Sequence, residues 1–253
     1  MKKEKDIKKY VKERYGKIAS EGSSCCPNSS CCTPDIIKQA KSLGYSEQEI
    51  ENLPEDAVMG LGCGNPTALA ELKEGETVMD LGSGGGIDVF LAAHKVGEKG
   101  KVIGVDMTPE MLQRARENAR KGNYNNVEFR LGEIENLPSA NDSVDVIISN
   151  CVINLSPDKL AVYKEIYRTL KPEGRILISD LVTEGELPED IRKSFSAWAG
   201  CIAGALEKKE YLDIIKKAGF RDITVVAEQP FNVQGMDIRL IGKIISIQVK
   251  AYK

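Results

Sequence analysis

The sequence predicts an α/β fold, in which helices cover both faces of a mostly parallel sheet and a helical extension precedes it. From residue 76 onward, short apolar segments typical of strands alternate with amphipathic segments typical of helices. Capping and turn-forming residues separate the two kinds of segment. The length of 253 residues and the hydrophobic content of 42% suit one domain with a short appendage.

Residues 1–58 are expected to form the helical N-terminal extension. Apolar side chains recur at helical spacing over residues 1–20, which predicts an amphipathic helix. A loop over residues 20–32 follows, with four cysteines among small residues. Two shorter helices should come next, and their start and stop residues are Thr33, Pro34, Gly44, Ser46 and Glu49.

Residues 59–253 are expected to form the α/β domain, which begins with a glycine-rich loop. Seven segments are typical of strands: 76–82, 101–107, 126–132, 144–150, 174–181, 223–229 and 243–252. One helix should run from Thr108-Pro109 to Gly122, and another from Ser156-Pro157 to just before Pro172. Residues 186–220 are predicted to be a helical segment that carries Cys201 and ends at Gly219.

Charge and hydropathy exclude several classes of protein. The chain has 35 basic and 38 acidic side chains, a balance that gives no global electrostatic reason to bind nucleic acid or an acidic membrane. No apolar run approaches the ~20 residues that span a bilayer. The basic N-terminus lacks the apolar stretch of a signal peptide. We therefore expect a cytoplasmic protein without nucleic-acid or membrane partners.

The histidine and cysteine counts limit the kinds of metal site and catalytic site that the chain can form. His94 is the single histidine, so multi-histidine metal sites are excluded. In a reducing compartment, the seven cysteines indicate metal binding or catalysis rather than a disulfide framework. They are Cys25, Cys26, Cys31, Cys32, Cys63, Cys151 and Cys201.

A glycine motif provides the sharpest local signal. The segment Asp80-Leu81-Gly82-Ser83-Gly84-Gly85-Gly86 ends the first predicted strand and opens a helix. Its glycines permit a tight turn and a close approach to a ligand. Ile87 stands where a dinucleotide fingerprint has glycine or alanine, which favours a nucleotide without a pyrophosphate. Asp106 ends the second strand, where a carboxylate can accept from both ribose hydroxyls. The alternative is a βα turn that binds nothing.

This pattern resembles the class I S-adenosylmethionine-dependent methyltransferases, which share a Rossmann-like seven-stranded sheet. The resemblance implies that S-adenosylmethionine is the cofactor and that the glycine motif lines its methionine part. Asp106 would hold the ribose, Met107 would pack on adenine, and Asn150 would lie near the methyl donor. The cofactor-binding residues implied are Asp80, Gly82, Ser83, Gly84, Gly86, Asp106, Met107, Glu133, Ile134 and Asn150.

Three cysteine contexts resemble a narrower family, the arsenite S-adenosylmethionine methyltransferases. These contexts are Gly62-Cys63-Gly64-Asn65-Pro66, Ser149-Asn150-Cys151-Val152-Ile153-Asn154-Leu155 and Cys201-Ile202-Ala203-Gly204-Ala205-Leu206. The resemblance implies that Cys63, Cys151 and Cys201 bind trivalent arsenic as substrate. It also implies a fourth thiol in a thiol–disulfide relay, either Cys31 or Cys32, with Cys32 favoured. The helical segment 186–220 would cover the substrate.

The implied cysteine ligands suit the chemistry of trivalent arsenic. Trivalent arsenic is soft and prefers thiolate sulfur. Bound to three thiolates it keeps one lone pair, which attacks the sulfonium methyl, so that no general base is needed at the acceptor atom. We expect an environment that lowers the thiol pKa from about 8.5 towards neutrality. A thiol reductant, thioredoxin or a small thiol, would be the partner.

Two other functions remain open from the sequence. A small-molecule methyltransferase of the quinone or sterol type has the same core fold, but this reading gives the three cysteines no role. A non-catalytic thiol metal-binding protein on the same scaffold would use the cysteines, but it would not need an intact cofactor loop. Taken alone, Cys151 and Cys201 also suit buried positions as small apolar residues.

Overall fold

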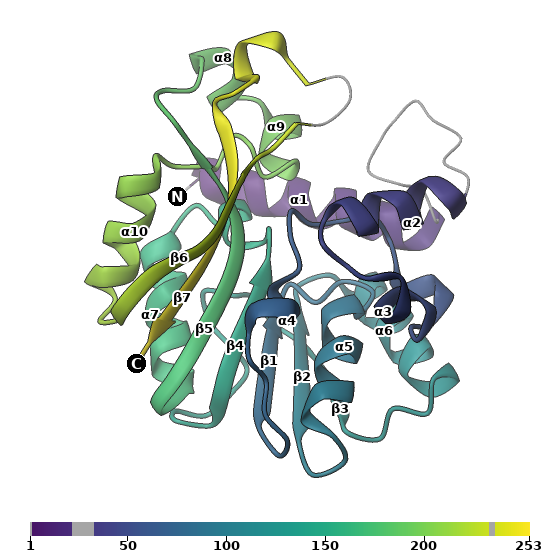
Figure 1. The fold of residues 1–253 in the computed structure, drawn as a ribbon. Helices are drawn as coiled ribbons and strands as arrows, with labels where there is room; N and C mark the ends of the chain where they lie inside the picture. Colours follow the sequence, from purple (N-terminus) through teal and green to yellow (C-terminus); the bar gives the residue numbers. More distant parts are fainter. Residues whose placement is uncertain (1, 22–32, 233–235) are drawn as a thin grey trace.

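A seven-stranded sheet in the order β3-β2-β1-β4-β5-β7-β6 forms the centre of the molecule (Figure 1). The computed structural model describes residues 2–21, 33–232 and 236–253. Strand β7 runs antiparallel to β5 and β6, and the other pairings are parallel, as the sequence predicts. The strands are β1 Thr77–Leu81, β2 Lys101–Asp106, β3 Val127–Leu131, β4 Val144–Asn150, β5 Leu170–Thr183, β6 Arg221–Pro230 and β7 Ile244–Tyr252.

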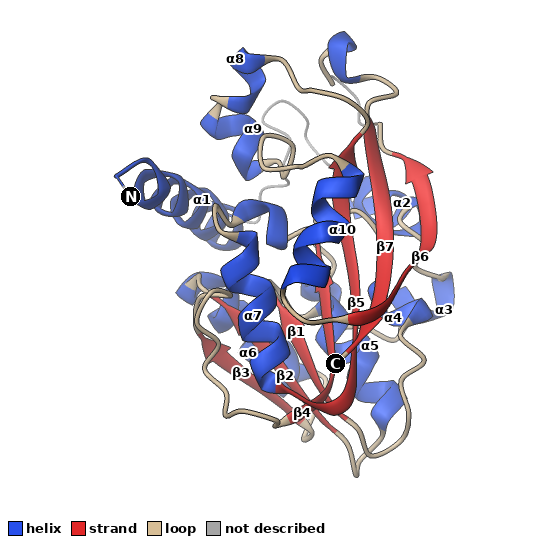
Figure 2. Cartoon of the chain, turned by 90° about the vertical axis from the view of Figure 1, so that its left-hand side faces the viewer, coloured by secondary structure: helices blue, strands red, loops and turns tan. Residues whose placement is uncertain are grey.

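Helices cover the sheet on both faces (Figure 2). Successive strand residues point to opposite faces, so Val78 packs in one apolar cluster and Met79 in the other. The first cluster holds α5 (Ile87–Val96) and α6 (Pro109–Lys121), and the second holds α7 (Lys159–Thr169) and α10 (Lys208–Lys217). In the described part of the chain, no helix is long and apolar enough to span a membrane.

The N-terminal extension supplies three helices, α1 (Lys2–Glu21), α2 (Thr33–Ser42) and α3 (Glu47–Glu51). Helix α1 lies across the end of the sheet where the parallel strands finish and packs against α6 and α9 (Phe195–Ala199) (Figure 1). It buries Ile7, Val11 and Ile18, which confirms the predicted amphipathic face. The predicted capping box of Ser46 and Glu49 is also present.

The junction between α7 and β5 differs from the prediction. The helix has Asp158 as its N-cap, with the Asp158 side chain accepting from the Ala161 N–H, so the predicted start at Ser156-Pro157 is wrong. The helix ends at Thr169, before Pro172 as predicted, but β5 starts at once at Leu170 and runs through Pro172. A shift in register between Val144 and Val146 of β4 accommodates the proline, which cannot donate to the ladder.

The helical segment predicted over residues 186–220 is largely irregular. It holds α8 (Glu189–Arg192), α9 and α10, joined by turns, and Cys201 lies in a turn rather than on a helix. Gly200 caps α9, and Cys201 then takes a positive φ of 62°. Glycine is typical of helix ends, so Gly200 and Gly204 mark a break that the apolar pattern concealed. The remaining helix, α4 (Pro66–Leu69), follows the Cys63 loop.

Candidate active site

The glycine motif forms a tight turn at the carboxyl end of β1. The Gly82 and Ser83 N–H groups both donate to the Val105 carbonyl of β2, at 2.7 and 3.0 Å. Gly82 has a φ of 67°, and a Cβ at this position would lie 2.4 Å from a Val152 methyl group. The turn therefore requires glycine at residue 82 and packs directly against the residue after Cys151.

Buried acidic side chains surround this turn. The Asp106 carboxylate accepts from the Gly84 N–H at 3.0 Å and from the Thr108 N–H at 2.8 Å, which fixes the ends of β1 and β2 together. Burial raises the pKa of Asp106 and raises that of Asp80 well above its usual range, and the nearby Asp88 carboxylate adds to the shift at Asp80. Such a cluster favours a cationic ligand.

A buried hydroxyl in the same turn lacks a partner. The Ser83 Oγ has no hydrogen bond to the part of the chain that the structure describes. An unsatisfied buried polar atom calls for an explanation, such as a ligand that supplies the missing bond. The residues of the turn thus fit a polar, positively charged ligand that carries hydroxyl groups.

The three residues predicted around adenine have different surroundings. Met107 packs against the cysteine cluster, and Ile134 packs against the core on the α7 side. The Glu133 side chain is exposed and forms an ion pair with Lys8 of α1, with 2.7 Å between Nζ and Oε2. Their contact with adenine stays a prediction.

Cys63, Cys151 and Cys201 lie together in one buried cluster. They are free thiols with exposed fractions of 0%, 8% and 5%, and they come from three separate segments of the chain. The Cys151 thiol interacts with the thiols of both Cys63 and Cys201. The Cys201 Sγ also donates to the Cys151 carbonyl at 2.7 Å. The site thus brings the three predicted cysteines next to the glycine motif.

The thiols do not stand in a preformed metal-ligand arrangement. No group of three or more His, Cys, Asp or Glu side chains among the described residues is placed to hold a metal ion. The Cys201 thiol points to a carbonyl, so it must exchange this bond before it can share a ligand with Cys63 and Cys151. Ligation by all three thiols therefore stays a prediction.

The thiol pKa values differ from expectation. Burial raises the pKa of Cys63 and raises that of Cys151 well above its usual range, where the sequence analysis expected lowered values. The prediction is wrong because desolvation disfavours a thiolate in an apolar cluster, and the neighbouring thiols and Asp180 add to the shift. Both cysteines are therefore protonated at neutral pH.

A buried polar network, not predicted from the sequence, lies near the thiols. Tyr163 donates to Tyr211 at 2.8 Å, and Tyr211 donates to Asp180 at 3.0 Å. Burial raises the pKa of Asp180 to about 7 and lowers that of Lys159 to about 8. The available signal was a carboxylate in the apolar strand ILISDL, since a buried charge in a strand requires partners.

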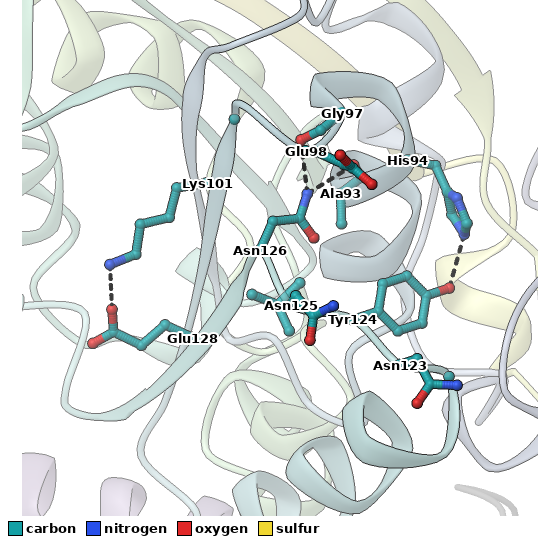
Figure 3. Close-up of a pocket in the computed structure, with 13 residues that line it drawn as sticks. Ala93, His94, Gly97, Glu98, Lys101, Asn123, Tyr124, Asn125, Asn126 and Glu128 are labelled. Carbon is teal, nitrogen blue, oxygen red and sulfur yellow. Dashed lines mark hydrogen bonds and ion pairs between the residues drawn. The ribbon is translucent and has the colours of Figure 1, made fainter.

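A separate hollow lies away from the predicted site, at the amino ends of β2 and β3 (Figure 3). None of the predicted site residues lines it. Its polar groups pair with each other: Asn126 donates to the Ala93 and Gly97 carbonyls, Lys101 pairs with Glu128, and His94 bonds to Tyr124. Several of the polar side chains that line the hollow are thus already paired with protein groups.

The four cysteines of the N-terminal loop, Cys25, Cys26, Cys31 and Cys32, lie outside the described residues. The role of Cys32 as relay thiol stays a prediction.

Comparisons with known proteins agree with this geometry. A family model described as a methyltransferase domain matches residues 72–219. The chain is 44% identical to an arsenite methyltransferase of Halobacterium salinarum over 87% of this chain and 59% of the relative. It is 34% identical to the arsenite methyltransferase of Homo sapiens, over 98% of this chain and 68% of the relative.

A solved structure supports the same relationship. An arsenic (III) S-adenosylmethionine methyltransferase from Chlamydomonas reinhardtii aligns with a TM-score of 0.69 and 36% identity, over 85% of this chain and 73% of the other. The chain spans 59% and 64% of the length of the first two curated relatives.

Proposed function

This chain belongs to the arsenite methyltransferase family, and we propose that it transfers methyl groups from S-adenosylmethionine to trivalent arsenic. The observation that carries the proposal is the placement of Cys63, Cys151 and Cys201. The three thiols form one buried cluster beside the glycine motif at the carboxyl edge of the sheet. Ligands of open α/β sheets bind at this edge.

The residues around the glycine motif fit the cofactor. The Asp80 carboxylate suits its ammonium group, the second lone pairs of the Asp106 oxygens suit the ribose hydroxyls, and the Ser83 Oγ can supply a further bond. S-adenosylmethionine supplies a sulfonium methyl group that an electron pair can displace. The protein contributes the position of the acceptor relative to that methyl.

The thiols suit arsenite because they are protonated. Arsenous acid carries three hydroxide groups, and each can leave as water with one thiol proton: As(OH)₃ + 3 RSH → As(SR)₃ + 3 H₂O. The exchange neither consumes nor releases protons, so no net charge enters the apolar cluster. The product has a lone pair on arsenic, which is the nucleophile, and no side chain needs to remove a proton from it.

The redox balance implies a thiol reductant. Methyl transfer uses the lone pair, so arsenic rises formally from +3 to +5. Two thiols return it to +3 by giving up two electrons and forming a disulfide. A thiol reductant, thioredoxin or a small thiol, then reduces that disulfide. Cys32 is the proposed relay thiol in this step, with arsenic detoxification in the cytoplasm as the outcome.

Arsenic speciation after incubation with arsenite, S-adenosylmethionine and a thiol tests the proposal. Methylated arsenicals should form with the wild-type chain and not with Cys151→Ser, since a hydroxyl oxygen is a hard ligand and soft trivalent arsenic prefers sulfur. Without S-adenosylmethionine, neither protein should form them. The proposal fails if the wild-type chain binds both arsenite and cofactor but forms no methylated product. Methylation of a quinone by Cys151→Ser at the wild-type rate would instead favour the quinone-type alternative.

A further inference from the structure

The Asn150 side chain joins the donor and acceptor sides of the site. Its Oδ1 accepts from the Cys63 N–H at 2.9 Å, and its Nδ2 donates to the Gly64 carbonyl at 2.7 Å. The same Nδ2 lies 3.0 Å from the Tyr45 hydroxyl and 3.3 Å from Asp88. One amide therefore holds the main chain on both sides of the Cys63 thiol.

Tyr45 and Asp88 in turn hold Asn150. Tyr45 is buried between α2 and α3 of the extension, and Asp88 is buried in the first turn of α5. The Tyr45 hydroxyl donates to Asp88 Oδ1 at 2.9 Å. The hydrogen bonds therefore run in one direction: the Cys63 N–H donates to Asn150, the Asn150 amide donates to Tyr45, and the Tyr45 hydroxyl donates to the carboxylate. Hydrogen bonds in such a chain strengthen each other.

The Cys63 loop depends on this contact for its shape. Gly62 has a φ of 120°, and a Cβ added there would lie 2.8 to 2.9 Å from the Asn150 amide atoms. The loop thus wraps closely around Asn150. Cys201, by contrast, donates its thiol hydrogen bond to the Cys151 carbonyl and not to any residue of this group. Movement of Asn150 should shift Cys63 more than Cys201.

We propose that Tyr45 and Asp88 are positioning residues that hold the Cys63 loop through Asn150, and that they couple this loop to the cofactor site. The coupling is electrostatic: the Asp88 carboxylate repels the Asp80 carboxylate, and Glu49 and Lys95 also act on Asp88. A cationic ligand at Asp80 relieves the repulsion between the two acids. Asp88 then accepts more strongly from Tyr45, and the Cys63 loop closes more firmly. The role at Cys63 rests on the proposed function, in which Cys63 is an arsenic ligand.

Alkylation of the thiols by iodoacetamide, followed by mass spectrometry, tests this proposal without arsenic. Cys63 is fully buried, so its alkylation reports on opening of the loop. In Tyr45→Phe, which lacks the hydroxyl, alkylation of Cys63 should be about five- to tenfold faster than in the wild type. Cys201 should keep its rate, and so should both thiols in the control Tyr124→Phe, whose hydroxyl bonds to His94.

The effect of S-adenosylmethionine on the alkylation rates is the second test. In the wild type it should slow the alkylation of Cys63 more than that of Cys201, and this difference should vanish in Tyr45→Phe and in Asp88→Asn. An equal acceleration at Cys63 and Cys201 would show general loosening and would overturn the proposal, as would an unchanged rate at Cys63. Extra protection of Cys63 that survives in both variants would refute the coupling. Because no arsenic is present, these results do not depend on whether arsenite is the substrate.

Discussion

The Cys201 thiol donates a hydrogen bond to the main-chain carbonyl of Cys151, with 2.7 Å between Sγ and O. The two residues also share a left-handed backbone, with φ values of 62° and 61°. This conformation is costly for residues with a Cβ. The Cys151 N–H is fixed to the Ser179 carbonyl of β5 at 2.8 Å, which helps to hold the strained conformation. Two of the three proposed arsenic ligands thus lie in strained backbone conformations.

Variants of Cys201 should distinguish the energetic cost of its positive φ from the contribution of its thiol to arsenite binding. We expect Cys201→Gly to be more stable than Cys201→Ala by about 0.5–1 kcal/mol, because glycine adopts a positive φ without strain. Urea unfolding measures this difference. Both variants should lose arsenite affinity to a similar extent. Equal stability of the two variants would show that the positive φ is not costly at this turn.

The two glycines of the cofactor turn should respond differently to alanine. A Cβ at Gly82 would lie 2.4 Å from Val152, whereas at Gly84 the nearest heavy atom would be 3.9 Å away. Both have a positive φ, so both variants carry a strain of roughly 1 kcal/mol. We expect Gly82→Ala to cost about 1–3 kcal/mol more in unfolding free energy, since overpacking adds to the strain.

Gly82→Ala should also disturb the thiol site. Val152 follows Cys151 directly, so displacement of Val152 should lower arsenite affinity as well as cofactor affinity. Gly84→Ala should affect the cofactor alone. Calorimetric titration with each ligand checks both variants, and a Gly82→Ala protein with normal arsenite affinity would contradict the expectation.

Asp106→Ala should weaken S-adenosylmethionine binding by about 1.5–3 kcal/mol, because it removes charge-assisted bonds to the ribose. Asp106→Asn should lose less, since its amide oxygen can keep one of the two main-chain bonds to Gly84 and Thr108. Calorimetry with S-adenosylmethionine compares the two variants. Unchanged affinity in Asp106→Ala would remove this residue from the cofactor site.

Asp180 should make stability depend on pH. Its pKa is about 7 in the folded protein, against an ordinary value of about 3.9 in the unfolded chain. Between these values the folded protein binds more protons, so stability should fall as the pH rises, by up to about 1.4 kcal/mol per unit. Above about pH 7, Asp180 is ionised in both the folded and the unfolded chain, so it should cause no further loss of stability.

The variant Asp180→Asn cannot ionise and should lose this component of the pH dependence. Urea unfolding at about pH 5 and about pH 7.5 provides the comparison, with Asp237→Asn as the control, because the ion pair with Arg239 lowers the pKa of Asp237 to about 2, below this interval. If wild type and Asp180→Asn lose stability equally over this interval, another group must titrate instead.

Cys63→Ser should separate the two rounds of methylation. Once arsenic carries one methyl group, two positions remain for sulfur. The Cys201 thiol is bonded to the Cys151 carbonyl, whereas Cys63 lies in the loop before β1. We therefore expect this variant to fail on arsenite but still convert methylarsenite to the dimethyl product. Arsenic speciation with each substrate checks this. Loss of both activities with normal S-adenosylmethionine affinity would mean that Cys63 also shapes the rest of the site.

Features set by neighbouring residues were predictable from the sequence. The strand that carries Asp80, the glycine turn and the capping box of Ser46 and Glu49 each arise from short-range geometry and appear as expected. The clustering of Cys63, Cys151 and Cys201 followed from the family resemblance. It could not be derived from spacing, since the segments are 88 and 50 residues apart.

Features that depend on distant contacts were not predictable. Tyr45 and Asp88 meet across 43 residues, and Asn150 reaches Tyr45 across 105. The raised pKa of Cys151 depends on how deeply three segments bury one another, which no local pattern reveals. Cys201 was placed on a helix because apolar side chains surround it, while the glycines on either side favour a turn.

The burial of the thiols affects which thiol-binding ions the protein can select. A zinc ion binds thiolates and brings no proton acceptor of its own, so the Cys63 and Cys151 protons would have to be released to solvent. Three thiolates around a divalent cation would also leave an uncompensated negative charge among apolar side chains. Arsenous acid avoids both costs, because its hydroxides take up the protons and the complex is neutral. Burial therefore discriminates against thiol-binding cations, a selectivity that an exposed set of the same three cysteines would lack.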